Sequence, residues 1–275
     1  MLGHAPAMFS FLPLASGSQG NSILIKGPGG AFLIDAGLPR RELLARLASA
    51  GQDPRDLTGI VLTHRHLDHV RAAGSLARRF RLPVWATERT ACHQRALPEL
   101  RRIHPHVPFE VAGCILHPVR LCHDAPETLA FMIEVDGQRI GVATDLGSSG
   151  GGLTSVFRSL DVLYLEFNHD AEMLREGPYP ASLKERVAGP QGHLSNAQGA
   201  ELLKQLACRR LRRLYLAHLS ETNNRPELAS AAAAKALAEI RLTGVEIEIA
   251  LQHEVSPAWT GVDFLDSLAG PIWRR

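Results

Sequence analysis

The chain has 275 residues, 45% of them hydrophobic and 21% charged, which is typical of a soluble globular protein with a sizeable core. Its net charge of +2 does not by itself indicate nucleic-acid binding, and no apolar stretch approaches the roughly 20 residues of a membrane span. The four cysteines form no C-x-x-C pair, so we expect mostly buried, reduced thiols in a cytoplasmic protein.

Three strands are predicted near the N-terminus. The apolar runs 9–14, 23–25 and 31–35 are separated by a Gly/Ser/Asn loop and a glycine-rich turn, which indicates a meander. Residues 1–7 lack a signal-peptide pattern, and we expect them to be a short N-terminal extension. Asp35 ends the third strand and is a candidate carboxylate for orienting a neighbouring site. An amphipathic helix is predicted over 42–50.

The segment that follows the apolar run Gly59–Leu62 reads His-x-His-x-Asp-His. The run is predicted to be a buried strand, and His64 and His66 point the same way if the extended geometry continues. Asp68 and His69 then fall in the first turn of the next helix and point elsewhere. This arrangement suits two adjacent metal ions better than one. Imidazole with carboxylate favours zinc, with manganese or iron as alternatives.

The rest of the chain alternates apolar runs and helical patterns. Helices are predicted at 70–80, from 88 onward, at 195–208 and at 229–240. Strands or apolar stretches fall at 83–86, 114–118, 129–135, 139–143, 162–166, 214–217 and 245–249. The glycine-rich segment 147–152 lacks the features of a phosphate loop and is predicted to be a flexible connection. Strands followed by helices, twice, predict an α/β fold: an αββα four-layer sandwich in one domain over residues 8–275.

Three later residues stand where predicted apolar segments end. His123 opens a loop after one such stretch, Asp145 ends the run Ile140–Thr144, and His218 follows residues 214–217. Each alone could equally be a capping or core polar residue. Together they repeat the design seen at His64, in which a strand delivers a His or Asp at its end. We therefore predict that all three complete the metal site.

The His-x-His-x-Asp-His segment is the hallmark of the metallo-β-lactamase superfamily, which the chain resembles over nearly its whole length. The resemblance implies the metallo-β-lactamase fold and a metal-dependent hydrolase. It also implies two ligand groups that share one bridging carboxylate: His64, His66 and His123 for one ion, Asp68, His69 and His218 for the other, and Asp145 between them.

Further segments are similar to those of small bacterial exonucleases of the WalJ/YycJ type. They are Leu14–Asn21, Glu166–Asp170, Tyr179–Pro180 with Leu183–Lys184, Gly192–Asn196, and Leu216–Ser220 with Asn223–Asn224. Phe167 departs from the small polar residue expected at its position. The Gly-His-Leu-Ser segment around His193 also resembles the catalytic histidine motif of ribonuclease Z. Both resemblances point to phosphodiesters rather than lactams.

The resemblance implies that a hydroxide bridging both metals, bound to Asp145 and hydrogen-bonded to Asp68, is the nucleophile. His193 precedes a predicted helix and is the candidate proton donor to the leaving oxygen, with a residue of an N-terminal capping loop as the alternative. Seven polar side chains are candidates for contact with substrate, although ordinary turn residues would look the same: Ser16, Ser18, Asn21, Asn168, His169, Asn223 and Asn224.

We therefore expect a dinuclear metal-dependent phosphodiesterase, more specifically a 5′-to-3′ DNA exonuclease acting in repair. The basic pairs at 184–186, 209–210 and 212–213 could contact further phosphates, although such pairs usually decorate a solvated face. Three alternatives remain: a small-molecule cyclic phosphodiesterase, a thioester or lactone hydrolase of the glyoxalase II type, and a non-catalytic protein that keeps the fold. The last would be expected to have lost ligands, and none is missing.

Overall fold

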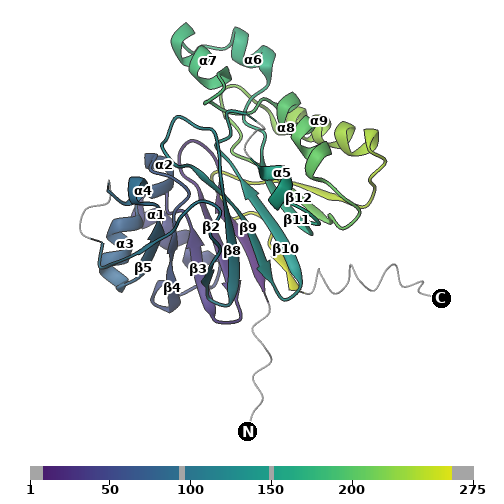
Figure 1. The fold of residues 1–275 in the computed structure, drawn as a ribbon. Helices are drawn as coiled ribbons and strands as arrows, with labels where there is room; N and C mark the ends of the chain where they lie inside the picture. Colours follow the sequence, from purple (N-terminus) through teal and green to yellow (C-terminus); the bar gives the residue numbers. More distant parts are fainter. Residues whose placement is uncertain (1–8, 93–96, 149–151, 262–275) are drawn as a thin grey trace, which may run out of the picture.

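In the computed structural model, which describes residues 9–92, 97–148 and 152–261, two seven-stranded sheets lie face to face (Figure 1). The first sheet has the order β14-β1-β2-β3-β4-β5-β6, and β3 to β6 run parallel. Its strands are β1 Ser10–Ala15, β2 Ser22–Gly27, β3 Gly30–Ile34, β4 Leu57–Val61, β5 Pro83–Ala86, β6 Glu99–Arg102 and β14 Trp259–Thr260. The expected extension at 1–7 and the C-terminal part of the expected domain lie outside the described residues.

The second sheet has the order β13-β12-β11-β10-β9-β8-β7. Its strands are β7 Phe109–Val111, β8 Cys114–Arg120, β9 Leu129–Val135, β10 Gln138–Ala143, β11 Val162–Glu166, β12 Arg213–Ala217 and β13 Glu246–Ile249. Strands β10 to β13 are parallel, and β9 runs antiparallel to both β8 and β10. The carboxyl ends of β8, β10, β11 and β12 therefore share one edge of this sheet.

Helices cover the outer face of each sheet. The helices are α1 Arg40–Ser49, α2 Leu67–Val70, α3 Ala73–Phe80, α4 Glu88–Ala91, α5 Leu153–Val156, α6 Ala171–Glu176, α7 Ala181–Ala188, α8 Asn196–Leu206 and α9 Pro226–Glu239. Apolar residues of α1 and α3 pack on the first sheet, and those of α8 and α9 pack on the second. The predicted αββα layering is confirmed. The pair α6–α7 stands above the sheets at one edge (Figure 1).

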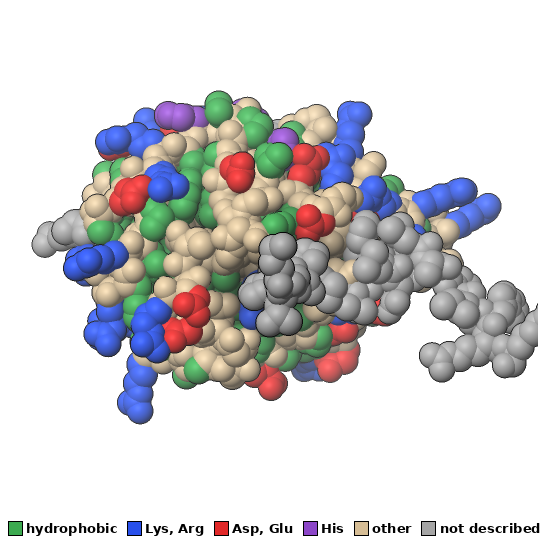
Figure 2. Space-filling model, turned by 90° about the horizontal axis from the view of Figure 1, so that it is seen from below, with side chains coloured by type: hydrophobic (Ala, Val, Ile, Leu, Met, Phe, Trp, Pro, Cys, Tyr) green, Lys and Arg blue, Asp and Glu red, His purple; other side chains and the backbone are tan. Residues whose placement is uncertain are grey.

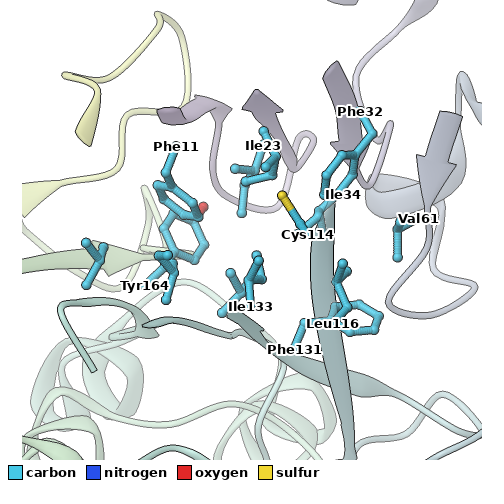
Figure 3. Packing of buried hydrophobic residues seen from close by; sticks show 14 of the residues in the cluster. Phe11, Ile23, Phe32, Ile34, Val61, Cys114, Leu116, Phe131, Ile133 and Tyr164 are labelled. Carbon is cyan, nitrogen blue, oxygen red and sulfur yellow. The ribbon is translucent and has the colours of Figure 1, made fainter. Parts of the chain in front are cut away.

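The core between the sheets is built from alternate residues of each strand, because successive side chains of a strand point to opposite faces. In β9, Phe131 and Ile133 face the first sheet, whereas Met132 faces the helices. Phe11 of β1 packs edge-on against Tyr164 of β11, with ring centroids 5.9 Å apart (Figure 3). Because such strands are buried on both faces, against the other sheet and against the helices, they appear in the sequence as apolar runs.

Several short elements escaped prediction because their sequences have no apolar periodicity. Three of the four residues of β6 are charged and exposed, and this strand exists through its parallel pairing with β5. Helix α7 has no buried residue. The expectation of mostly buried thiols was wrong: Cys114 lies in the core, but Cys92 and Cys122 are exposed. None of the helices in the described ranges is long and apolar enough to cross a membrane.

Candidate metal centre

The predicted ligands come together at one edge, where strand ends of both sheets meet. His64 lies just beyond β4, Asp145 just beyond β10, and His218 directly after β12. His123 lies in the loop after β8, and His69 lies in α2. All five side chains are buried, whereas ionisable groups are normally exposed unless they are paired or bind a metal.

The seven side chains form two groups that match the predicted division. The ligand atoms of His64, His66 and His123 lie within 4.8 Å of one another, and so do those of Asp68, His69 and His218. Asp145 lies between the groups. Its Oδ2 is 3.2 Å from His69 Nε2, and its Oδ1 is 3.7 Å from His123 Nε2 and 3.9 Å from His218 Nε2. One carboxylate therefore reaches both groups, as a bridging ligand must.

Three residues at this edge adopt a left-handed backbone that residues other than glycine rarely adopt. The φ angles are 61° at Asp35, 60° at Asp145 and 56° at His218. Such conformations are costly and persist where neighbouring groups fix them. Here the His218 amide donates to Ser16 Oγ at 2.8 Å, and the Asp145 amide donates to Glu166 at 3.1 Å. The strand ends are thus held in the turn that directs these side chains into the site.

The Nδ1 atom of three imidazoles lies within hydrogen-bond distance of an acceptor. His69 Nδ1 lies 2.7 Å from Asp35 Oδ2, His218 Nδ1 lies 3.0 Å from Glu166 Oε1, and His123 Nδ1 lies 3.1 Å from a backbone carbonyl oxygen. Carboxylate and carbonyl oxygens only accept, so each Nδ1 donates a proton, and Nε2 is the nitrogen that can bind a metal once its own proton is displaced. This predetermined tautomer is the one that a metal ligand needs, and the predicted orienting role of Asp35 is confirmed.

His64 is fixed in the same way through a hydroxyl group. Thr63 Oγ1 donates to Asp35 Oδ2 at 2.7 Å and so accepts from His64 Nδ1 at 3.0 Å. Three buried atoms of the site are then short of partners among the described residues: His64 Nε2 and His218 Nε2 have no hydrogen bond, and Asp145 Oδ2 has only its 3.2 Å contact with His69 Nε2. Buried polar atoms without partners are rare and costly. Divalent cations between the two groups would satisfy all three, so the residues present fit a dinuclear site.

The carboxylates of the site hold protons on some of its histidines when no metal neutralises them. Burial alone would raise the pKa of Asp145, but His218 and His69 lower it well below its usual range. Burial would lower the pKa of His218, but the negative charges of Asp145, Asp68 and Glu166 raise it to about 10. Burial and the neighbouring His69 lower the pKa of His64 well below its usual range. A cation bound here would therefore replace protons.

Glu166, at the end of β11, is the functional residue that sequence reasoning missed. Its Oε1 accepts from His193 Nδ1 at 2.9 Å, from His218 Nδ1 at 3.0 Å and from the Asp145 amide. Its Oε2 accepts from two further backbone amides at 3.0 Å. Burial would raise its pKa, but these partners, His193 foremost, lower it to about 2. The available signal was a glutamate ending an apolar strand, the same pattern as at Asp145.

His193 lies at the rim of the site, with 21% of its side chain exposed. Its ring centroid is 5.3 Å from that of His123 and 5.1 Å from that of His218. It precedes the Ser195 N-cap of α8 by two residues. Because Nδ1 donates to Glu166, Nε2 is the ring nitrogen available to a bound substrate. This placement favours the predicted proton-donor role over that of a capping loop residue.

The predicted substrate contacts fall into two classes. Ser18 is exposed, whereas the other six are buried: Ser16, Asn21, Asn168, His169, Asn223 and Asn224. Asn168 Nδ2 donates to the carbonyl oxygen of His218 at 2.9 Å, and Asn224 Nδ2 donates to that of Phe167 at 2.8 Å. The backbone amide of Asn21 donates to the Asp68 carbonyl oxygen at 2.7 Å. Because these six side chains are buried, a role in holding the loops of the site is favoured over direct contact with a substrate.

The basic residues at 209–213 are poorly placed for the predicted phosphate contacts. Arg210 pairs with the buried Asp161, and Arg213 pairs with Glu246. Both arginines stand at the amino end of β12, opposite the end that leads to His218. Figure 2, which shows the molecule from below, has acidic and basic side chains interspersed rather than one basic stripe. Sequence charge alone does not show which end of a strand faces the site.

Comparison with known proteins agrees with this geometry. The model of the metallo-beta-lactamase superfamily matches residues 15–165. The exodeoxyribonuclease WalJ of Streptococcus pneumoniae serotype 2 (strain D39) is 32% identical over 259 residues, covering 90% of this chain and 95% of the relative. The exodeoxyribonuclease YycJ of Bacillus anthracis is 32% identical over 235 residues, covering 83% and 89%.

Among solved structures, the metallo-beta-lactamase fold protein YhfI of Bacillus subtilis superimposes with a TM-score of 0.71 at 16% identity, covering 92% of this chain and 99% of that protein. This likeness confirms the predicted fold. The sequence matches extend over most of the chain, and the predicted ligands form the cluster described above. The chain therefore belongs to the metallo-beta-lactamase superfamily of hydrolases, and its cluster of histidines and aspartates is a site for divalent metal ions.

Proposed function

We propose that the protein is a dinuclear metal-dependent DNA exonuclease. The observation that supports this most is the pair of ligand groups sharing Asp145, with the His193–Glu166 pair beside them, in a chain whose curated relatives are exodeoxyribonucleases at 32% identity. Nitrogen and oxygen ligands favour zinc, with manganese or iron as alternatives. The 5′-to-3′ direction, a role in DNA repair and a cytoplasmic location are parts of this proposal that depend on the resemblance alone.

Each residue of the site has a defined task in phosphodiester hydrolysis. Two bound divalent ions would supply Lewis acidity and lower the pKa of water. Asp145 reaches both ligand groups and holds them together, and Asp68 adds a partly exposed carboxylate beside His69 and His218. His193 leaves Nε2 available to a bound substrate, and a proton on this atom can pass to the leaving oxygen. Glu166 fixes the orientation of that imidazole by accepting a hydrogen bond from its Nδ1 at 2.9 Å.

Activity on a substrate panel tests the proposal. Metal-loaded protein is incubated with end-labelled single- and double-stranded DNA and RNA, and separately with S-lactoylglutathione, a cephalosporin and a cyclic nucleotide. We expect stepwise release of nucleotides from the 5′ end of DNA, and no appreciable lactam or thioester cleavage. Rapid hydrolysis of S-lactoylglutathione or of the cyclic nucleotide, with DNA left intact, would favour the corresponding alternative hydrolase instead.

A further inference from the structure

A cavity of about 680 Å³ lies beside the metal centre. His123 and Asp124 form its wall at the metal centre, and Arg120, His106 and Gln191 are among its other lining residues. Its volume falls within the range of roughly 300–1,000 Å³ that is usual for ligand sites. Because it shares His123 with the metal centre, a molecule bound in the site can extend into it.

Arg120 is the unpaired positive charge of this cavity. It is the last residue of β8 and is exposed, and its side chain makes no hydrogen bond or ion pair with any other described residue. The acidic side chains of the lining are already near arginines outside it. Asp124 accepts from Arg186 Nε at 2.7 Å, and Glu127 lies 3.8 Å from Arg89 Nε. The guanidinium of Arg120 is therefore left to bind an anion from solution, and its planar fork suits phosphate.

His106 adds a second donor on the same wall. Its backbone has a φ of 64°, and its amide donates to the carbonyl oxygen of Pro118 at 2.8 Å. This bond ties the loop between β6 and β7 to the end of β8, near Arg120. The His106 side chain is exposed and lines the cavity that opens on the metal centre.

We propose that this cavity is a subsite for a backbone phosphate of the DNA strand, next to the phosphate that is hydrolysed. Arg120 holds this phosphate, with His106 as a second donor. Arg120 and His123 are three positions apart in the chain, so their Cα atoms are at most about 11 Å apart, and one DNA strand can contact both. The subsite rests on the proposed function and adds to it the residue that distinguishes a polynucleotide from a small phosphodiester.

The test compares Arg120→Ala with the wild-type enzyme on two substrates. On single-stranded DNA we expect kcat/KM to fall on the order of 10-fold, and the slope of log Kd against log salt to shrink by about 0.7–1. Hydrolysis of bis(p-nitrophenyl) phosphate, which has no second phosphate for Arg120 to hold, should not change. Arg120→Lys should keep the salt slope. Arg209→Ala, an exposed arginine near the amino end of β12, is the matched control and should behave as wild type.

The outcomes separate the subsite from the function on which it rests. If the wild-type enzyme degrades DNA and Arg120→Ala leaves kcat/KM unchanged on both substrates, the proposed subsite is wrong and the proposed nuclease activity stands. An equal loss on both substrates also overturns it, since Arg120 would then act on the metal centre. If the wild-type enzyme hydrolyses the small phosphodiester but never DNA, both proposals fall. Metal content and melting temperature show that each variant is folded.

Discussion

At the scale of single residues, His218, a proposed metal ligand, differs in burial from His193, the proposed proton donor. His218 has its Nε2 buried without a hydrogen-bond partner among the described residues, whereas His193 is partly exposed at the rim. Both share the Oε1 atom of Glu166 through Nδ1. Their roles therefore differ by position rather than by bonding, and substitution separates them.

We predict that His193→Ala keeps both ions while turnover on DNA falls by on the order of 10²–10⁴, the usual range for a positioned proton donor. A nitrophenyl phosphodiester should lose much less, because its leaving group needs little protonation. His218→Ala should deplete one ion and damage both substrates alike. Metal analysis and kinetics on both substrates check this, and the reverse pattern would exchange the two assignments.

At the scale of elements, the strand-end pattern was readable from the sequence. Apolar runs that stop on His64, Asp145 and His218 became β4, β10 and β12, with these residues at their carboxyl ends. Glu166 obeys the same pattern, but its partners lie 27 and 52 residues further along the chain. Nothing local shows that an acidic strand end will meet two imidazoles, so its role needed the tertiary structure. Helix α7 was not predicted for a simpler reason: it buries no side chain, so its sequence has no apolar periodicity.

Helix α2, which carries Asp68, packs closely against Gly37. A Cβ atom added to Gly37 would lie 1.6 Å from the Asp68 carbonyl oxygen and 2.8 Å from the Asn21 amide nitrogen. Gly37→Ala must therefore push α2 away and displace Asp68 and His69. We expect weaker binding of one ion and a lower melting temperature. Gly137→Ala is the control, since its φ is 76° but nothing lies within 4 Å; it should lower stability without changing metal content.

Metal titrations followed by calorimetry measure both quantities in the two glycine variants. The packing account fails if Gly37→Ala binds two ions as tightly as wild type. It fails equally if the control loses metal, because backbone strain alone would then explain the effect.

At the scale of the whole molecule, the metal-free protein should show a stability that depends on His218. The pKa of this group is raised from 6.5 to about 10 because Asp145, Asp68 and Glu166 outweigh the effect of burial. Its stabilising contribution is therefore complete below pH 6.5 and is lost as the pH rises through about 10. We expect the melting temperature of the metal-free protein to fall over this range. Metal loading should remove most of the fall, since ions then replace the protons.

Calorimetry of the metal-free and metal-loaded proteins in matched buffers measures the difference. A melting temperature that rises with pH in the metal-free protein, or an equal fall in both forms, would contradict this account of the buried charges.

The measurement that tests the central claim most directly is the number of metal ions per chain in wild type and in Asp145→Ala. Elemental analysis after loading with excess metal and removal of the free ions should give two ions for the wild-type protein. Asp145→Ala should give fewer than two and lose activity on DNA, because one carboxylate reaches both ligand groups. Asp56→Ala, a change at an exposed aspartate in the turn before β4, should keep two ions. A single ion in saturated wild-type protein would contradict the dinuclear site.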